Sequence, residues 1–289
     1  MRDYIIMTDS CCDLTAEMAQ ELGLVVLPLS LLMGEDTYRN FLDGREIGFK
    51  EFYDRIRKGD TATTSAVSVG DFEEAMRPIL AEGKDILCLN FSSALSTTYQ
   101  SADIAARDLQ EEFPDATIRV VDTLSASLGQ GLLVYLCAQQ KKAGKSLDEV
   151  WQYAEETKQH MSHWVTVDDL NHLKRGGRIS ATTAVVGTML SIKPVIYINE
   201  EGKLINVGTA RGRKAALLQV VSEMEKRVMD PSVPVFISHG DCEDDAKFVA
   251  DEVHNRTGAE VKLINYVGPV IGSHTGAGVI ALCFLGKER

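Results

Sequence analysis

Five hydroxyl side chains occur within seven consecutive residues, between an apolar run at 85–91 and the helical pattern that follows it. They belong to Ser92, Ser93, Ser96, Thr97 and Thr98. Three roles are open to such a cluster: a helix cap, a nucleophile for acyl chemistry, or a set of donors for an anion. Ser96 is a natural cap for a helix that we expect to begin at about Thr97. Capping uses only one or two hydroxyls, so the rest of the cluster needs another explanation.

The position of this cluster favours an anion site. Ligands of parallel sheets bind at the carboxyl ends of the strands, where the free N–H groups and the dipole of the next helix favour negative charge. A second hydroxyl-rich segment, at 61–68, precedes another expected helix at 69–82, although a polar loop explains it equally well. Together the two segments predict neutral donors around one anion.

Among the six histidines, His274 is the strongest candidate for a functional role. It lies in a glycine-rich turn, where an imidazole seldom serves as core filler. An esterase or acyltransferase that uses Ser93 or Ser96 with His274 is the alternative function. The chain has no G-x-S-x-G elbow, and no acidic residue stands out as a third catalytic member, so the sequence favours binding over catalysis.

Composition and charge exclude several classes of protein. The 289 residues carry a formal net charge of −12, which repels nucleic acid and anionic membranes. The six cysteines form no C-x-x-C pair, and we expect no metal site. The N-terminal apolar run is too short for a signal peptide, and no apolar run reaches the length of a membrane span. We expect a cytoplasmic protein without stable membrane insertion.

Two patterns of elements divide the chain near residue 163. In residues 1–162, short apolar strands alternate with helices, which predicts an α/β domain with a mostly parallel sheet and helices on both faces. In residues 163–289, a hairpin at 193–199 and 203–210 precedes further helices and strands. This second half therefore predicts an α+β domain with a mixed or antiparallel sheet.

Seven short motifs, in order along the chain, resemble those of the DegV family. They are Thr8-Asp-Ser-Cys-Cys-Asp-Leu14, Thr64-Ser65 with Ser68, the segment from Ser92 to Ala102, Val121-Asp-Thr123 with Ser125, Ser127 and Gly131, the segment from Leu170 to Ser180, Arg211 to Ala215, and His274 to Gly278. The resemblance covers nearly the whole chain. The departures are Ala66 and Val67 in place of Gln-Pro, Thr97 in place of Gly, and Ala277 in place of Pro.

This resemblance implies a two-domain α/β fold that holds a long-chain fatty acid between the domains. It also implies the acyl-binding subunit of a bacterial fatty acid kinase, which serves phospholipid metabolism. Such a subunit presents the carboxylate to a separate ATP-dependent kinase, which makes the acyl-phosphate. The fatty acid would be the ligand, with no cofactor, and the subunit itself would have no catalytic activity.

The resemblance also implies roles for eight residues. Thr64 and Ser96 would bind the carboxylate, with Ser65 and Ser93 near it. His274 would face the head group from the second domain, and Arg211 would lie near the carboxylate or phosphate. Arg175 and Arg178 would dock the kinase.

The acyl chain would need an apolar slot. A chain of about 16 carbons gains on the order of 12 kcal/mol gross on burial, at about 0.8 kcal/mol per methylene. The residues available to line such a slot, each of which also fits an ordinary core, include Leu29, Leu31, Phe91, Met189, Leu190 and Ile192.

Overall fold

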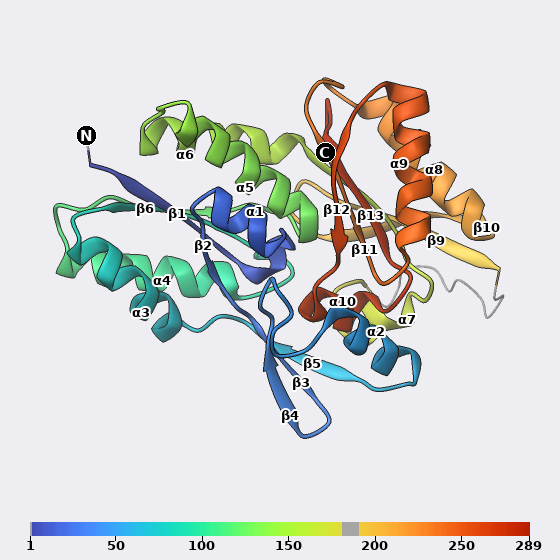
Figure 1. The fold of residues 1–289 in the computed structure, drawn as a ribbon, viewed down its shortest axis with the longest axis horizontal. Helices are drawn as coiled ribbons and strands as arrows, with labels where there is room; N and C mark the ends of the chain where they lie inside the picture. The colour runs from blue at the N-terminus through green and yellow to red at the C-terminus, as the bar shows by residue number, and fades with distance from the viewer. Residues whose placement is uncertain (1, 181–190) are drawn as a thin grey trace.

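The computed structural model describes residues 2–180 and 191–289, which form three sheets (Figure 1). Sheet A is parallel, in the order β2-β1-β6-β7. Its strands are β1 (Tyr4–Asp9), β2 (Val25–Leu27), β6 (Asp85–Asn90) and β7 (Ile118–Asp122). Helices α3 (Val69–Ala81) and α4 (Thr98–Glu112) lie on one face, and α5 (Ser127–Lys142) and α6 (Leu147–Thr157) lie on the other (Figure 1). The predicted parallel sheet with helices on both faces is confirmed.

Sheet C is the mixed sheet of the second half, in the order β10-β9-β8-β13-β11-β12. Its strands are β8 (Met161–Thr166), β9 (Ile192–Ile198), β10 (Leu204–Arg211), β11 (Val235–His239), β12 (Val261–Tyr266) and β13 (Ile280–Leu285). Only β11 and β12 pair in parallel. Helices α8 (Arg213–Arg227) and α9 (Glu243–Thr257) cover its outer face (Figure 1). The predicted mixed sheet and its β9–β10 hairpin are confirmed.

The third sheet, sheet B, was not predicted. It is antiparallel, in the order β4-β3-β5, with strands β3 (Ser30–Met33), β4 (Asp36–Arg39) and β5 (Ala62–Ser65). Pro28 interrupts the apolar run at 25–32, so its first part joins sheet A and its second part joins sheet B. The hydroxyl-rich segment at 61–68 is therefore partly a strand. Helix α2 (Phe49–Arg57) covers sheet B through an apolar cluster that includes Leu31 and Phe52.

Helix α5 packs against both large sheets. Most of its residues are buried, and it contacts β6 of sheet A as well as β8, β11 and β13 of sheet C. Two glycines allow this close approach: a Cβ on Gly131 would lie 2.4 Å from the Cys12 carbonyl oxygen, and a Cβ on Gly129 would lie 1.8 Å from His163 Nε2. The helix therefore belongs to the cores of both halves.

Several element boundaries differ from the predicted ones. Helix α4 begins at Thr98 with Thr97, and not Ser96, as its N-cap residue. Ser96 Oγ lies one position earlier and accepts the N–H of Thr98 at 3.2 Å. Helix α6 ends at Thr157, where a 3₁₀ turn leads into β8. The short helices are α1 (Ala16–Glu21), α7 (Asn171–Arg175) and α10 (Pro269–Thr275). None of the described helices has the length and apolar character needed to cross a membrane.

Candidate ligand-binding site

A largely apolar cavity of about 380 Å³ lies where the carboxyl edge of sheet A faces sheet C. The segments that follow β2, β6 and β7 form one wall, and β8, β9, β10 and α10 form the other. Its apolar lining includes Leu29, Phe91, Val165, Ile198, Leu204 and Ile271. Because side chains from both halves form the walls, a molecule in this cavity would contact both sheets. The volume falls within the range of small-molecule sites.

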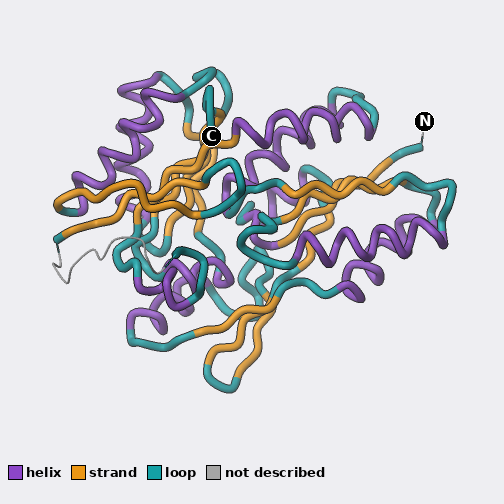
Figure 2. The backbone as a smooth tube through the Cα atoms, turned by 180° about the vertical axis from the view of Figure 1, so that it is seen from behind, coloured by secondary structure: helices purple, strands orange, loops and turns teal. Residues whose placement is uncertain are grey.

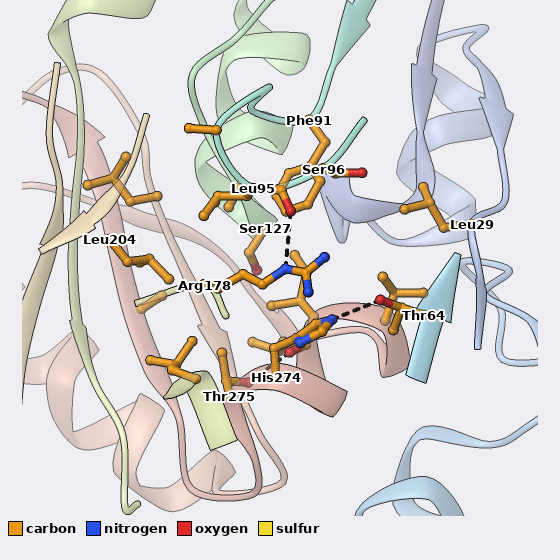
Figure 3. A pocket seen from close by; sticks show the side chains of 18 of the residues that line it. Leu29, Thr64, Phe91, Leu95, Ser96, Ser127, Arg178, Leu204, His274 and Thr275 are labelled. Atoms are coloured by element: carbon orange, nitrogen blue, oxygen red, sulfur yellow. Dashed lines mark hydrogen bonds between the residues drawn. The ribbon is translucent and has the colours of Figure 1, made fainter. Parts of the chain in front are cut away.

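One part of the cavity wall is polar, and it joins residues that are distant in the sequence. Thr64, on β5, and His274, in the last turn of α10, are hydrogen-bonded between Oγ1 and Nε2 at 2.8 Å (Figure 3). Both line the cavity. The prediction that His274 lies in a turn is wrong, because residues 269–275 form a helix that begins at Pro269 and ends before Gly276.

Arg178 brings a positive charge into the cavity. Its Nε donates to the Leu95 carbonyl oxygen at 3.2 Å and its Nη1 donates to the Gly176 carbonyl oxygen at 2.5 Å. The guanidinium lies close to the His274 ring (Figure 3). Partial burial lowers the pKa of Arg178. The cation is thus held by backbone carbonyls beside the Thr64–His274 pair, where it can face an anion.

The three predicted serines also line the cavity. Ser96 Oγ accepts the Thr98 N–H and shares a hydrogen bond with Thr98 Oγ1 at 2.9 Å. Ser93 is held by its backbone N–H, which donates to Asp122 Oδ1 at 3.1 Å. Ser65 follows Thr64 at the end of β5. The structure therefore brings Thr64, Ser65, Ser93, Ser96 and His274 to one cavity.

Gly176 makes room for the His274 ring. A Cβ on this residue would lie 2.2 Å from His274 Nδ1, so any other residue would displace the imidazole. Burial, together with the nearby Arg178 charge, lowers the pKa of His274 to about 4. The ring is therefore neutral at pH 7 and can donate through only one of its nitrogens.

This pKa predicts an acid-sensitive contribution to stability. The folded-state pKa of His274 lies below the ordinary value of 6.5. The contribution of neutral His274 to the free energy of unfolding is therefore complete above pH 6.5 and is lost as the pH falls to about 4. Between pH 7 and pH 4, we expect the free energy of unfolding of the wild type to fall by about 3 kcal/mol more than that of His274→Gln. Urea unfolding at both pH values measures this difference. An equal fall in the free energy of unfolding of the wild type and of His274→Gln would contradict the low pKa of His274. His254→Gln, at an exposed position of α9, is the matched control.

Arg211, predicted beside the head group, does not reach the cavity in the described structure. Leu204 begins β10 and lines the cavity, whereas Arg211 ends the same strand and is exposed. Arg211 lies seven positions further along the strand than Leu204, a distance of about 23 Å at roughly 3.3 Å per residue. Arg178, for which a docking role was expected, lies in the cavity instead, while Arg175 is exposed.

The predicted lining of the slot is only partly correct. Leu29 and Phe91 line the cavity. Leu31 instead packs beneath α2, and Ile192 pairs with Arg211 at the distant end of the hairpin. Met189 and Leu190 lie outside the described residues.

A second, polar hollow of about 330 Å³ adjoins the first. Thr64, Arg178 and His274 line both spaces. The remaining polar lining comes from Asp60, Thr61, Thr63, His172, Arg175 and Ser273. The polar end of the apolar cavity therefore adjoins a polar hollow that includes the exposed Arg175.

Sequence reasoning assigned no role to three polar residues of the cavity wall, Ser127, His163 and Thr275. Ser127 opens α5 after β7, and His163 lies on β8. The rule that directs attention to the carboxyl ends of parallel strands applies to β7 as it does to β6, so it could have identified Ser127. His163 gave no such signal, because its place in the wall depends on the packing of sheet C against α5.

The arrangement does not assemble a hydrolase triad. In the part of the chain that the structure describes, neither Ser93 nor Ser96 hydrogen-bonds to His274, and no carboxylate bonds to its ring. Across residues 2–180 and 191–289, no three histidine, cysteine or acidic side chains gather in a group that could hold a metal ion. The hydroxyls, imidazole and guanidinium form a set of donors that suits an anion.

The fold and the site define an α/β protein of two large sheets, with an apolar cavity between them that has hydroxyl, imidazole and guanidinium groups in one part of its wall. A family model described as an uncharacterised protein of the DegV family matches residues 4–287. The chain belongs to the DegV family.

Relatives and solved structures agree with this assignment. A DegV domain-containing protein of Clostridium perfringens is 46% identical, over 100% of this chain and 99% of that protein. The structure is similar to that of a fatty-acid-binding DegV family protein from Thermus thermophilus, with 32% identity, a TM-score of 0.87, and coverage of 99% and 100% of the two chains. It is also similar to a stearic acid-binding protein from Eubacterium ventriosum, with 26% identity, a TM-score of 0.88 and 98% coverage of both chains.

Proposed function

We propose that this protein binds a long-chain fatty acid in the apolar cavity, between its two halves, 1–162 and 163–289. The observation that carries the proposal is the cavity itself, whose apolar walls lead to a cluster of donors formed by Thr64, Ser96, His274 and Arg178. An acyl chain gains free energy on burial, and its carboxylate needs donors once it leaves water. The fatty acids bound by the Thermus thermophilus and Eubacterium ventriosum relatives support this assignment.

The hydrogen bonds suggest how the carboxylate is held. We assign the proton of neutral His274 to Nε2, from which it donates to Thr64 Oγ1. This assignment leaves the Thr64 hydroxyl proton free for the ligand. Ser96 Oγ accepts the Thr98 N–H, so its own proton can also turn toward the carboxylate. Arg178 supplies the countercharge, and Ser65 and Ser93 lie beside the same group.

We further propose that the protein, in the cytoplasm, presents this carboxylate to a separate ATP-dependent kinase that forms the acyl-phosphate. The polar hollow supports this step, because Thr64, Arg178 and His274 line it as well as the cavity, so a second protein bound there would lie next to the head-group residues. The exposed Arg175 at this hollow is the residue that we assign to docking. Because no triad is assembled around His274 in the described residues, we assign the protein no catalysis of its own.

Mass spectrometry of the organic extract of natively purified protein tests the binding proposal. We expect near-stoichiometric fatty acid, and this will also reveal the length and saturation of the chain. A protein that is empty and that also fails to take up added palmitate would rule out fatty-acid binding. Turnover of an ester by the purified protein would instead support the esterase alternative.

Presentation to a kinase is tested separately with palmitate-loaded protein. With ATP, a bacterial fatty acid kinase and hydroxylamine as the trap, we expect palmitoyl hydroxamate from the wild type. Arg175→Ala should retain its lipid and lose at least about tenfold in transfer, or about 1.4 kcal/mol. Lys142→Ala, an exposed change on α5, should behave as the wild type. Equal transfer by both variants would contradict the docking role of Arg175.

A further inference from the structure

The carboxyl group of Asp13 is buried where the two halves of the chain meet. Asp13 follows the 3₁₀ turn after β1 and is 3% exposed. Its Oδ2 accepts the hydroxyl of Ser127 at 2.5 Å, and its Oδ1 accepts the N–H of Gly268 at 3.0 Å. Its main-chain oxygen accepts the side-chain N–H of Asn265 at 2.8 Å. One residue of the first half is thus bonded both to the start of α5 and to the second half.

Ser127 and Gly268, which are hydrogen-bonded to the carboxyl, both belong to segments that form the cavity wall. Ser127 is itself part of the cavity wall. Gly268 immediately precedes α10, and the other end of this helix carries His274. A seven-residue helix extends only about 10 Å, at 1.5 Å per residue. A shift at Gly268 is therefore transmitted to the His274 ring, which has little room beside Gly176.

We propose that Asp13 is a positioning residue for the head-group site: by holding Gly268 and Ser127 together, it fixes α10 and therefore the His274 ring against Thr64. This inference rests on the proposed fatty-acid binding. It assigns a role in ligand affinity to the second aspartate of the Thr8-to-Leu14 motif, although Asp13 itself does not line the cavity.

The surroundings of Asp13 favour its neutral form. No arginine or lysine in the described ranges forms an ion pair with it, and burial raises its pKa to about 8. The titratable groups that interact with it are Asp9 on β1, Cys11 and Cys12 in the 3₁₀ turn, Tyr53 on α2 and Cys283 on β13. Burial raises the pKa of each of these groups too.

Ionisation of Asp13 would therefore create a buried charge without a partner, which is costly. The folded-state pKa is above the ordinary value of 3.8, so the proton is retained at neutral pH and is lost as the pH rises through about 8. The Ser127 hydroxyl and the Gly268 N–H would be drawn more tightly to the carboxylate, and water drawn into the surrounding core by the new charge would shift the start of α10 from its position. Ligand affinity should fall over the same pH range.

The test measures palmitate affinity at pH 6.5 and pH 9, by displacement of a fluorescent fatty acid. We expect the Kd of the wild type to rise about fivefold or more at pH 9. Asp13→Ala should weaken binding about tenfold at both pH values. Asp13→Asn keeps the shape of the neutral carboxyl, so it should restore most of that affinity and show no change with pH. Asp251→Asn, at an exposed position of α9, should follow the wild type.

The outcomes separate this inference from the function on which it rests. Wild-type protein that binds no palmitate at either pH would overturn both. Palmitate binding that is unchanged in Asp13→Ala, or that keeps the wild-type pH dependence in Asp13→Asn, would overturn the positioning role alone. If Asp13→Ala does not fold, the pH profile of Asp13→Asn decides, because Asp9 is present in both proteins and cannot account for a difference between them.

Discussion

Replacement of Gly176 by alanine should raise the Kd for palmitate at least about 30-fold, or about 2 kcal/mol. The added methyl carbon would lie 2.2 Å from His274 Nδ1, so the ring must move. This movement breaks the 2.8 Å hydrogen bond that orients the Thr64 hydroxyl toward the head-group site. Isothermal titration with palmitate measures the loss, and thermal unfolding confirms that the variant is folded.

Gly70→Ala provides a matched control for this substitution. Gly70 lies in α3, and the nearest atom to an added Cβ is Ser68 Oγ at 3.9 Å. The change should leave the affinity unaltered and raise stability by about 0.5 kcal/mol, since alanine loses less conformational freedom in a helix than glycine. Equal affinities for Gly176→Ala and Gly70→Ala would show that the position of His274 does not govern binding.

Leu204→Glu should reduce palmitate affinity more than about 100-fold, or by more than about 2.7 kcal/mol. Leu204 points into the cavity from the start of β10 (Figure 3). A carboxylate there would either remain ionised in an apolar space or hold water in it, and both oppose burial of the acyl chain.

Val207→Glu is the control on the same strand, since Val207 is 51% exposed. Displacement of a fluorescent fatty acid by palmitate, measured for both variants at one protein concentration, compares their palmitate affinities directly. Val207→Glu should bind as the wild type does. If Leu204→Glu also binds normally, the acyl chain does not occupy this cavity.

The hydroxyl cluster shows how much of the site could be predicted from the sequence. Its position after an apolar strand and before a helix is a local pattern, and the carboxyl edge of a parallel sheet is a general place for ligands. This reasoning led to Ser93 and Ser96, which line the cavity. The alternation of strands and helices likewise led to sheet A.

Contacts between distant segments could not be predicted in the same way. Thr64 and His274 are 210 positions apart, and their hydrogen bond depends on where α10 packs against sheet B. Sheet B itself was missed because its strands are short and partly polar, so they resemble loops. Arg211 was expected beside the head group for a related reason: motif order does not show which end of the β9–β10 hairpin faces the cavity.

The packing of α5 between the two large sheets determines how the cavity can be filled. Figure 2 shows from behind that the two large sheets lie on opposite sides of the molecule, with helices between them. Parting the sheets would expose buried side chains of α5 such as Leu128, Leu132 and Leu133, at about 1.5–3 kcal/mol each. We therefore expect the protein to load its ligand by local movement at the rim of the cavity, and the two halves to unfold together as one cooperative unit.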